Sequence, residues 1–332
     1  MKIAITGGAG FIGSRIAKEY LDAGHAVLVI DNLANGSEDA IDPRARFYNV
    51  DIRDSKIRTI LQKERPEIVS HHAVHRGSSL PSEQAMIDAD VNIRGFLHLL
   101  DCCVDSPVKK IIFASNGNDL YGDVTPNQNP LSETTLLAPR RSLDISKAAG
   151  ESYVRYYTRQ YGLEHTILRY ADVYGEEPWN KAQHPLSYFI KEVSQHRRPL
   201  IQGTGAAIRD QIFIDDVVLA NQAALERGKN QTLHISSGNG ASLNQLFTLV
   251  ASYLGSDLTP NYTSGSLCLP EKVTMDNTYA QESLHWFPRV SLADGVKRSI
   301  MLLNRAEGLP PIQQDIYAYA ATEAVKIPLH SS

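Results

Sequence analysis

The chain has 332 residues, of which 42% are hydrophobic and 21% are charged. These shares exclude wholesale disorder, and the length fits about two domains of 100–200 residues. The net charge of −4 gives no basic footprint for a nucleic acid. Three cysteines cannot make a disulfide framework, and no apolar run reaches the roughly 18 residues of a membrane span. We therefore expect a cytoplasmic protein with neither a nucleic-acid nor a membrane partner.

The first 170 residues alternate short apolar runs with helical patterns. The runs expected to be strands are Lys2–Thr6, Ala26–Ile30, Arg46–Val50, Glu67–Ser70, Lys109–Ala114 and Glu164–Tyr170. The main helical patterns are Phe11–Ala23, Pro81–Val104 and Ser142–Tyr161. Continuous apolar strands separated by helices predict a parallel sheet covered on both faces. The expected fold class is α/β, a doubly wound Rossmann sheet with a smaller C-terminal substrate lobe.

After Gly175 this rhythm is interrupted by polar sequence rich in Pro and Trp. The later patterns predict helices at Leu186–Gln195, Val217–Glu226, Leu243–Leu254 and Gln313–Ala324, and strands at Gln211–Ile214 and Thr232–Ile235. We expect residues 1–175 to form the Rossmann domain, with 206–240 returning to it. Residues 176–205 and 241–332 would form the substrate lobe and a tail.

The most specific pattern is TGGAGFIG at Thr6–Gly13, which follows a strand and opens a helix. Glycines at these positions permit a tight turn and the close approach of a pyrophosphate, whose charge the helix N-terminus stabilises. Asp31 ends the second strand, where a carboxylate accepts hydrogen bonds from ribose hydroxyls and repels a 2′-phosphate. The pattern therefore predicts that the Rossmann domain binds NAD rather than NADP. A glycine-rich turn without a ligand is the alternative.

Together with further motifs, these residues resemble the extended short-chain dehydrogenase/reductase family, and most closely its NAD-dependent nucleotide-sugar epimerases and dehydratases. The motifs cover nearly the whole chain. They are TGGAGFIG (6–13), DNLANGS (31–37), DIRD (51–54), HHA (71–73), DVNIRG (90–95), SNGNDLYG (115–122), SKAAGE (146–151), LRYADVYG (168–175), RDQIFIDDV (209–217) and ISSGNG (235–240).

The resemblance implies a set of cofactor contacts and a homodimer. NAD would lie along Gly7, Gly10, Phe11, Ile12, Gly13, Asp31, Asn32, Asn35, Gly36, Asp51, Ile52, His72, Ala73, Val74, Asn92, Ser115, Lys147, Tyr170 and Val173. Lys147 would hold the nicotinamide ribose. Two copies would pair through the long helices at Pro81–Val104 and Ser142–Tyr161. No metal site is expected, because the adjacent His71 and His72 point apart at a strand end.

The sequence departs from the family at the proton-transfer group. The family places a tyrosine four residues before the lysine, on the same helix face, and its phenolate takes a hydroxyl proton. Here the lysine is Lys147, but Leu143 occupies the tyrosine position and can neither donate nor accept a proton. The candidates for another base are Asp119, Tyr121, Asp144, His75 and Asp172.

Three further departures concern the substrate. Asn116 follows Ser115 where the family has a substrate-orienting hydroxyl, Asp172 replaces an asparagine near the substrate phosphate, and no arginine lies near residues 269–271. Arg209 is retained. The expected catalytic positions are Ser115, Asn116, Leu143 and Lys147, and the expected substrate contacts are His75, Asn118, Asp172 and Arg209.

The leading hypothesis is an NAD-dependent epimerase or dehydratase that acts on a sugar or nucleotide sugar through transient oxidation of a carbinol. Two alternatives stay open. Asp172 and the missing arginine favour NAD-assisted lyase or cyclase chemistry on a small non-nucleotide metabolite. Leu143 favours an NAD-binding protein in which catalysis has been lost, by natural divergence or by a deliberate Tyr→Leu change.

Overall fold

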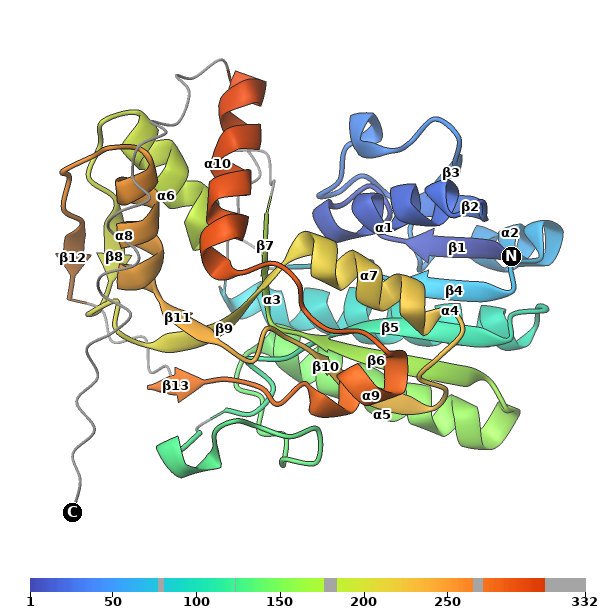
Figure 1. The fold of residues 1–332 in the computed structure, drawn as a ribbon. Coiled ribbons are helices and arrows are strands. Elements are labelled where there is room, and N and C mark those ends of the chain that lie inside the picture. The colour runs from blue at the N-terminus through green and yellow to red at the C-terminus, as the bar shows by residue number, and fades with distance from the viewer. Residues whose placement is uncertain (77–80, 123, 176–183, 265–270, 308–332) are drawn as a thin grey trace. The chain divides into compact units, whose positions relative to one another are not determined.

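The computed structural model describes residues 1–76, 81–122, 124–175, 184–264 and 271–307, and the chain divides into two compact units (Figure 1). Unit 1 comprises Met1–Val173, Arg209–Gly240 and Pro270–Arg289. Unit 2 comprises Tyr174–Ile208, Ala241–Leu269 and Val290–Ser332. The sequence expectation placed 270–289 in the substrate lobe, whereas the structure assigns this segment to unit 1.

Unit 1 is built on a seven-stranded sheet in which every neighbouring pair is parallel. Its strand order is β10 (Gln231–Ile235), β6 (Glu164–Tyr170), β5 (Lys110–Asn116), β4 (Ile68–His71), β1 (Lys2–Thr6), β2 (Ala26–Asp31) and β3 (Arg46–Asn49). Helices cover both faces (Figure 1). The predicted doubly wound fold class is therefore confirmed.

The two helical layers follow from the alternation of side chains along the strands. Ala4, Leu28 and Val69 belong to a core cluster with apolar residues of three helices, α2 (Lys56–Glu64), α4 (Phe96–Val104) and α5 (Ser142–Tyr161). On the other face, α1 (Phe11–Asp22) packs against α7 (Ile214–Ala224). The buried Tyr20 hydroxyl of α1 donates to the Asn221 carbonyl of α7 at 3.1 Å.

The long helix predicted over Pro81–Val104 is divided into three parts. They are α3 (Pro81–Asp88), a π-helical stretch η2 (Ala89–Gly95) and α4. Such wider turns occur frequently at functional sites. Here the wide turn carries Asn92, whose side-chain amide makes two hydrogen bonds with the backbone of His75.

Segment 270–289 belongs to unit 1 because its contacts are with strands and helices of that unit. β13 (Lys272–Val273) pairs with β9 (Ile208–Phe213), which also pairs with β7 (Asp172–Tyr174). α9 (Thr278–Leu284) packs on β10. The buried indole of Trp286 donates to the Asp216 carbonyl at 2.9 Å. Two short 3-10 helices, η1 (Glu38–Ala40) and η3 (Pro126–Gln128), lie in loops of unit 1.

Unit 2 is mainly helical. Helices α6 (Pro185–Ser194), α8 (Leu243–Tyr253) and α10 (Leu292–Glu307) pack against one another, with Phe189 and Phe247 in an edge-to-face contact. β8 (Leu200–Gln202) pairs in parallel with β12 (Asn261–Thr263), and β11 (Gly240–Ser242) precedes α8. The helix predicted at Gln313–Ala324 lies outside the described residues.

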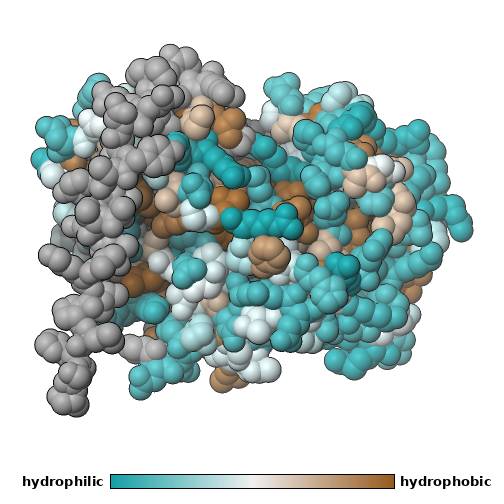
Figure 2. Space-filling model, viewed as in Figure 1, coloured by the Kyte–Doolittle hydropathy of each residue, from teal (hydrophilic) through white to brown (hydrophobic). Residues whose placement is uncertain are grey.

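Hydrophilic residues predominate on the face of the molecule in Figure 2, and hydrophobic ones are scattered among them. None of the helices in the described part of the chain combines the length and the hydropathy needed to span a membrane.

Candidate functional site

The strand order places a change of winding direction at the centre of the sheet. From β1 the strands run through β2 to β3 on one side, and from β4 through β5 and β6 to β10 on the other. In doubly wound sheets a ligand binds outside the carboxyl ends of the strands at this point. Here the relevant loops are the glycine turn after Thr6 and the segment after His71. Thr6 and His71 are paired in register on neighbouring strands. The candidate site lies around them, within unit 1.

The glycine turn has no room for side chains at two positions. Gly7 has φ +73°, and a Cβ there would lie 2.5 Å from the Ala73 nitrogen. A Cβ on Gly13 would lie 2.2 Å from the Gly7 carbonyl oxygen. Helix α1 then begins after Gly10 without a capping side chain or an acidic residue in its first turn. The turn thus offers backbone amides and a positive helix end to an anion.

Asp31 holds the glycine turn to the end of β2. Its carboxylate accepts the Ala9 amide at 3.0 Å and the Leu33 amide at 2.8 Å, and the residue is 9% exposed. A Cβ on Gly36 would lie 2.7 Å from the Ala9 Cβ, so the loop after β2 packs directly on the turn. Each carboxylate oxygen of Asp31 keeps further acceptor capacity for ribose hydroxyls.

Asp51, at the predicted adenine end of the site, is held in place by an ion pair with Arg53. Arg53 donates to both oxygens of Asp51 at 2.8 Å and holds the pKa of that carboxyl at about 2, while Asn32 donates to the same group at 2.8 Å. Ile52 is buried, and its carbonyl oxygen lies 2.8 Å from Nδ1 of His98. Asp51 is therefore a fixed anion at the end of the third strand. Asn35 is exposed.

The segment after β4 is fixed by the buried His71 and the half-buried His72. His71 Nδ1 lies 2.7 Å from the Thr6 hydroxyl, and His72 Nε2 lies 2.9 Å from the Ser70 hydroxyl. The His72 ring stacks parallel to Tyr170, and burial lowers its pKa to about 3, so it is neutral. His72 Nδ1 is buried without a protein hydrogen-bond partner.

Lys147 projects from α5 to the end of β5. Its ammonium donates to the Ala114 carbonyl at 2.7 Å and lies 5.1 Å from the centre of the Phe113 ring. Burial, helped by the charge of Arg76, lowers its pKa to about 7. Within the described residues it makes no ion pair, so its remaining N–H groups are available to a ligand.

The positions around the missing tyrosine form a polar pair. Leu143 is half-buried in the first turn of α5. The Asn116 amide donates to Asp144 at 2.6 Å, and Arg141 donates to the other oxygen of Asp144 at 2.7 Å. This leaves the Asn116 carbonyl oxygen without a donor among the described residues. The Ser115 hydroxyl is directed elsewhere and donates to the buried Glu151 at 2.7 Å.

Asp172 is part of a chain of alternating charges. Arg209 donates to Asp172 at 3.2 Å and to Asp119 at 2.5 Å, and Asp119 also pairs with Arg141. The charge that the sequence analysis placed near a substrate phosphate is therefore neutralised in part by Arg209.

The predicted substrate contact Asn118 lies in the interior of unit 1. This residue is 1% exposed, and its amide donates to the Asp210 carbonyl at 2.9 Å. The loop after β5 turns back into the protein at this point, because Gly117 donates from its backbone to the Tyr170 carbonyl at 2.7 Å. The other predicted cofactor residues Phe11, Ile12, Val74 and Val173 are half-buried.

Sequence reasoning missed two buried acids. Asp88 is fully buried, and its Oδ1 lies 2.9 Å from Nδ1 of His75. Asp88 and Asn92, which both contact His75, are four residues apart, a spacing that hinted at one shared face. Glu151 anchors Ser115, Arg155 and Arg169 through hydrogen bonds of 2.7–2.8 Å. Its signal was an acid four residues after Lys147.

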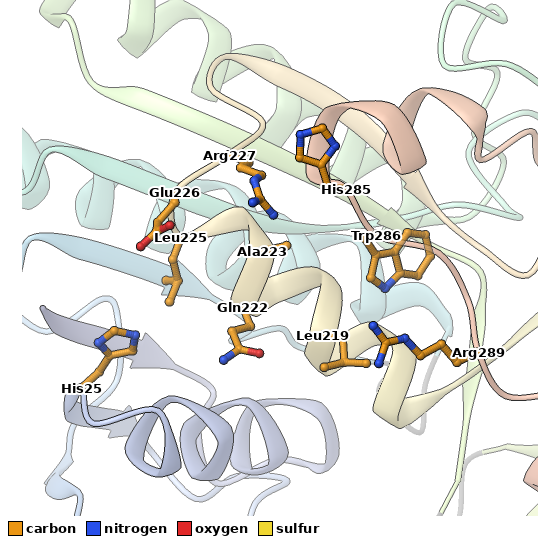
Figure 3. A pocket seen from close by; sticks show the side chains of 10 residues that line it. All are labelled: His25, Leu219, Gln222, Ala223, Leu225, Glu226, Arg227, His285, Trp286 and Arg289. Carbon is orange, nitrogen blue, oxygen red and sulfur yellow. The ribbon is translucent and has the colours of Figure 1, made fainter.

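A separate pocket of about 330 Å³ lies elsewhere in unit 1 (Figure 3). Its lining includes His25, Glu226, Arg227, Trp286 and Arg289. His25 precedes β2, so this pocket is at the amino end of the strands, opposite the glycine turn. None of its lining residues was predicted to be functional.

The buried amine of Lys147 predicts a pH-dependent stability of the cofactor-free protein. Its folded pKa of about 7 lies below the value of about 10.4 for an unfolded chain. Between these values the unfolded chain binds more protons, so stability rises with pH, by up to about 1.4 kcal/mol per pH unit. Urea unfolding at several pH values should show this rise, and Lys147→Met should remove it. The exposed Lys109→Met is the control; equal slopes for wild type and Lys147→Met would contradict the prediction.

Comparison with known proteins identifies relatives of the whole chain. The model of the "NAD dependent epimerase/dehydratase family" matches residues 3–236. A putative UDP-glucose 4-epimerase of Methanocaldococcus jannaschii is 34% identical over 299 residues, covering 90% of this chain and 97% of that protein. The UDP-glucose 4-epimerase of Mycolicibacterium smegmatis is 30% identical over 308 residues, with the same coverage of both chains.

Solved structures of UDP-glucose 4-epimerases have the same fold. The enzyme of Thermotoga maritima, solved with UDP-glucose, gives a TM-score of 0.88 at 35% identity and covers 92% of this chain and 100% of its own. The enzyme of Thermus thermophilus, in complex with NAD, gives 0.85 at 29% identity with the same coverage. These matches favour the leading hypothesis over the lyase, cyclase and non-catalytic alternatives. The chain belongs to the NAD dependent epimerase/dehydratase family.

Proposed function

We propose that unit 1 binds NAD across the glycine turn. The closely packed Gly7 and Gly13, the uncapped start of α1 and the ordered carboxylate of Asp31 support this proposal. The buried His72 Nδ1 without a protein partner is consistent with a ligand beside the loop after β4. When bound, NAD would supply the capacity to take a hydride from a carbinol carbon and to return it.

Each end of the site would hold one half of the cofactor. Asp31 would accept hydrogen bonds from the adenosine ribose, with Gly36 and Ile52 bordering the base. Lys147 would donate to the nicotinamide ribose through the N–H groups not used by Ala114. The loop His72–Val74 would cover the nicotinamide and exclude water from it.

We infer that the substrate is a nucleoside diphosphate sugar and the reaction an epimerisation through transient oxidation of a ring carbinol. Two relatives that match 90% of the chain are a putative UDP-glucose 4-epimerase and a UDP-glucose 4-epimerase, and this observation carries the inference. The Asn116 carbonyl oxygen would accept a hydrogen bond from a sugar hydroxyl. Arg209, fixed by two carboxylates, would contact the sugar. Unit 2 would be the substrate lobe.

The substrate assignment is tested by incubating the protein with NAD and UDP-glucose, UDP-galactose, UDP-glucuronate or their N-acetylated counterparts. We expect at least one pair of C4 epimers to interconvert, measured by proton NMR of the anomeric signals. Heat-inactivated protein is the control. If no member of the panel is interconverted, a UDP-sugar epimerase function is excluded.

The cofactor assignment predicts the effect of Asp31→Asn. Removing the charge weakens the hydrogen bonds to the ribose and relieves repulsion of a 2′-phosphate. NAD affinity should fall about ten- to hundredfold, and the preference for NAD over NADP should shrink. Calorimetric titration of the cofactor-stripped protein measures both. Asp39→Asn, an exposed acid on η1, is the matched control. Unchanged NAD binding in Asp31→Asn would refute the assignment.

We also propose that two copies pair through α3 and α5. Met86 on α3 is 74% exposed, and Ile145 and Tyr156 on α5 are 50% and 45% exposed. Ile145, Tyr153 and Tyr156 follow the helical period and form one stripe. Such a stripe is explained by a second helix pair covering it.

The dimer predicts a solution mass of about twice 36.7 kDa in size-exclusion chromatography with light scattering. Tyr156→Glu buries a charge in the pairing face and should give a monomer. Leu136→Glu places the same charge on a loop side chain that is 85% exposed, and should leave the mass unchanged. A monomeric wild-type protein would refute the pairing.

A further inference from the structure

The proposed reaction needs a group that takes the carbinol proton, and Leu143 cannot do so. Five other residues near the carboxyl edge of the sheet carry groups that can accept protons: Asp119, Tyr121, Asp144, His75 and Asp172. The structure separates them by what each side chain already contacts.

Four of the five, the three aspartates and Tyr121, already form hydrogen bonds or ion pairs with arginine side chains. Asp144 accepts hydrogen bonds from Asn116 and Arg141 on its two oxygens. Asp119 is paired with Arg141 and Arg209, and Asp172 with Arg209. Each of these carboxylates therefore already accepts hydrogen bonds from a guanidinium of the protein.

Tyr121 is also committed. It is 3% exposed, its hydroxyl accepts a hydrogen bond from Arg169 at 2.8 Å, and it contacts His234. Burial raises the pKa of this phenol to about 12. Tyr121 therefore cannot replace the missing tyrosine as a base at neutral pH.

His75 has a different environment. Its Nδ1 lies 2.9 Å from Asp88, and Asn92 accepts from its backbone N–H at 2.8 Å and donates to its carbonyl at 3.1 Å. Its side chain is 22% exposed. Within the described residues nothing hydrogen-bonds Nε2. The described contacts thus hold the ring through Nδ1 alone.

His75 also lies in the loop that borders the site. It follows Ala73, whose backbone closes on Gly7, by two residues. The next residue, Arg76, lies near enough to Lys147 for its charge to lower the lysine pKa. Helix α3 and η2, which carry Asp88 and Asn92, pack against α5, the helix of Leu143 and Lys147.

We propose that His75 takes the carbinol proton in place of the missing tyrosine, with Asp88 as its positioning residue. This inference rests on the proposed function. Asp88 would accept the Nδ1–H, which fixes the tautomer that leaves a lone pair on Nε2, and would stabilise the imidazolium that forms. Asp88 is 0% exposed, and its second oxygen has no hydrogen-bond partner among the described residues.

The step balances with the cofactor as the oxidant. The O–H bond breaks and its proton goes to Nε2 of neutral His75. The carbon–oxygen bond would become a carbonyl as the carbinol hydrogen leaves with the C–H electron pair, as a hydride that bound NAD would accept. The reverse step returns the proton from the imidazolium.

Among the described residues, Asp88 faces His75 from α3, and Arg76 follows it in its own loop. Lys147 lies on α5, which packs against α3 and η2, and it interacts electrostatically with Arg76. On η2, Asp90 and Arg94 pair with each other at 2.5 Å. The part of the pH–rate profile that depends on His75 should therefore change in Asp88→Asn and stay unchanged in surface variants.

The test uses a UDP-sugar that the wild-type protein interconverts. It measures the rate at which this sugar reduces bound NAD, from pH 5 to pH 9, in wild type, His75→Gln and Asp88→Asn. We expect His75→Gln to lose about 10²–10⁴-fold in rate, with the NAD dissociation constant unchanged. Asp88→Asn should lose less and shift the acid limb of the pH profile. His25→Gln, at the pocket in Figure 3, is the matched control and should stay within twofold of wild type.

Two measurements distinguish a proton acceptor from a structural residue. Added imidazole should restore part of the rate to His75→Gly, in proportion to its concentration. Nitrogen-15 NMR of the cofactor-free protein should show His75 protonated at Nδ1 at neutral pH, and this tautomer should be lost in Asp88→Asn.

The outcomes separate the two proposals. If wild type reduces NAD and His75→Gln does so within threefold, the His75 inference is overturned while the function stands. The inference also fails if neutral His75 is protonated at Nε2. If none of the UDP-sugars leads to reduction of NAD by the wild-type protein, the proposed function fails, and the proton-accepting role fails with it.

Discussion

The contact between the glycine turn and its two neighbouring strands is the constraint on which the rest of the site depends. Gly7 closes on the backbone of Ala73, and Ala9 donates to the carboxylate of Asp31. Any side chain at Gly7 would separate β1 from the loop after β4, and that loop carries His75. One close backbone approach therefore sets both the cradle for a pyrophosphate and the position of the group proposed to move the proton.

Beneath the site, a buried ion network fixes the ends of β5 and β6. Glu151 accepts hydrogen bonds from Ser115 and Arg169 in the interior. Buried pairs of this kind contribute little net stability, but breaking one typically costs 3–5 kcal/mol. Glu151 lies one turn from Lys147, for which the described residues provide no ion-pair partner. The same helix thus carries a carboxylate held by arginines and an amine whose one described hydrogen bond goes to the Ala114 carbonyl.

The sequence was sufficient for the features that depend on local pattern. The strands of the sheet, the glycine turn and Asp31 follow from apolar runs and spacing, and the structure places them as predicted. The division of Pro81–Val104 by a π-helical turn was missed because no internal proline marks a break in the helical pattern. The burial of Asn118 was not foreseen because the loop after β5 turns inward, and the place of segment 270–289 was missed because its contacts with β9 and α7 are distant in sequence. The ion pair of Asp172 with Arg209 is equally non-local.

Two of the predicted departures from the family, Asn116 and Leu143, lie close together in the structure. Asn116 and Asp144 are hydrogen-bonded to each other, so the amide that replaces a hydroxyl is oriented by an acid in the same helical turn as Leu143. A leucine there removes a proton acceptor and leaves the apolar half of the site intact. A decayed enzyme would be expected to lose polar order around such a gap. Here the amide is paired, Lys147 remains in place, and a buried acid on α3 contacts the imidazole of His75. This order is what a relocated proton transfer requires.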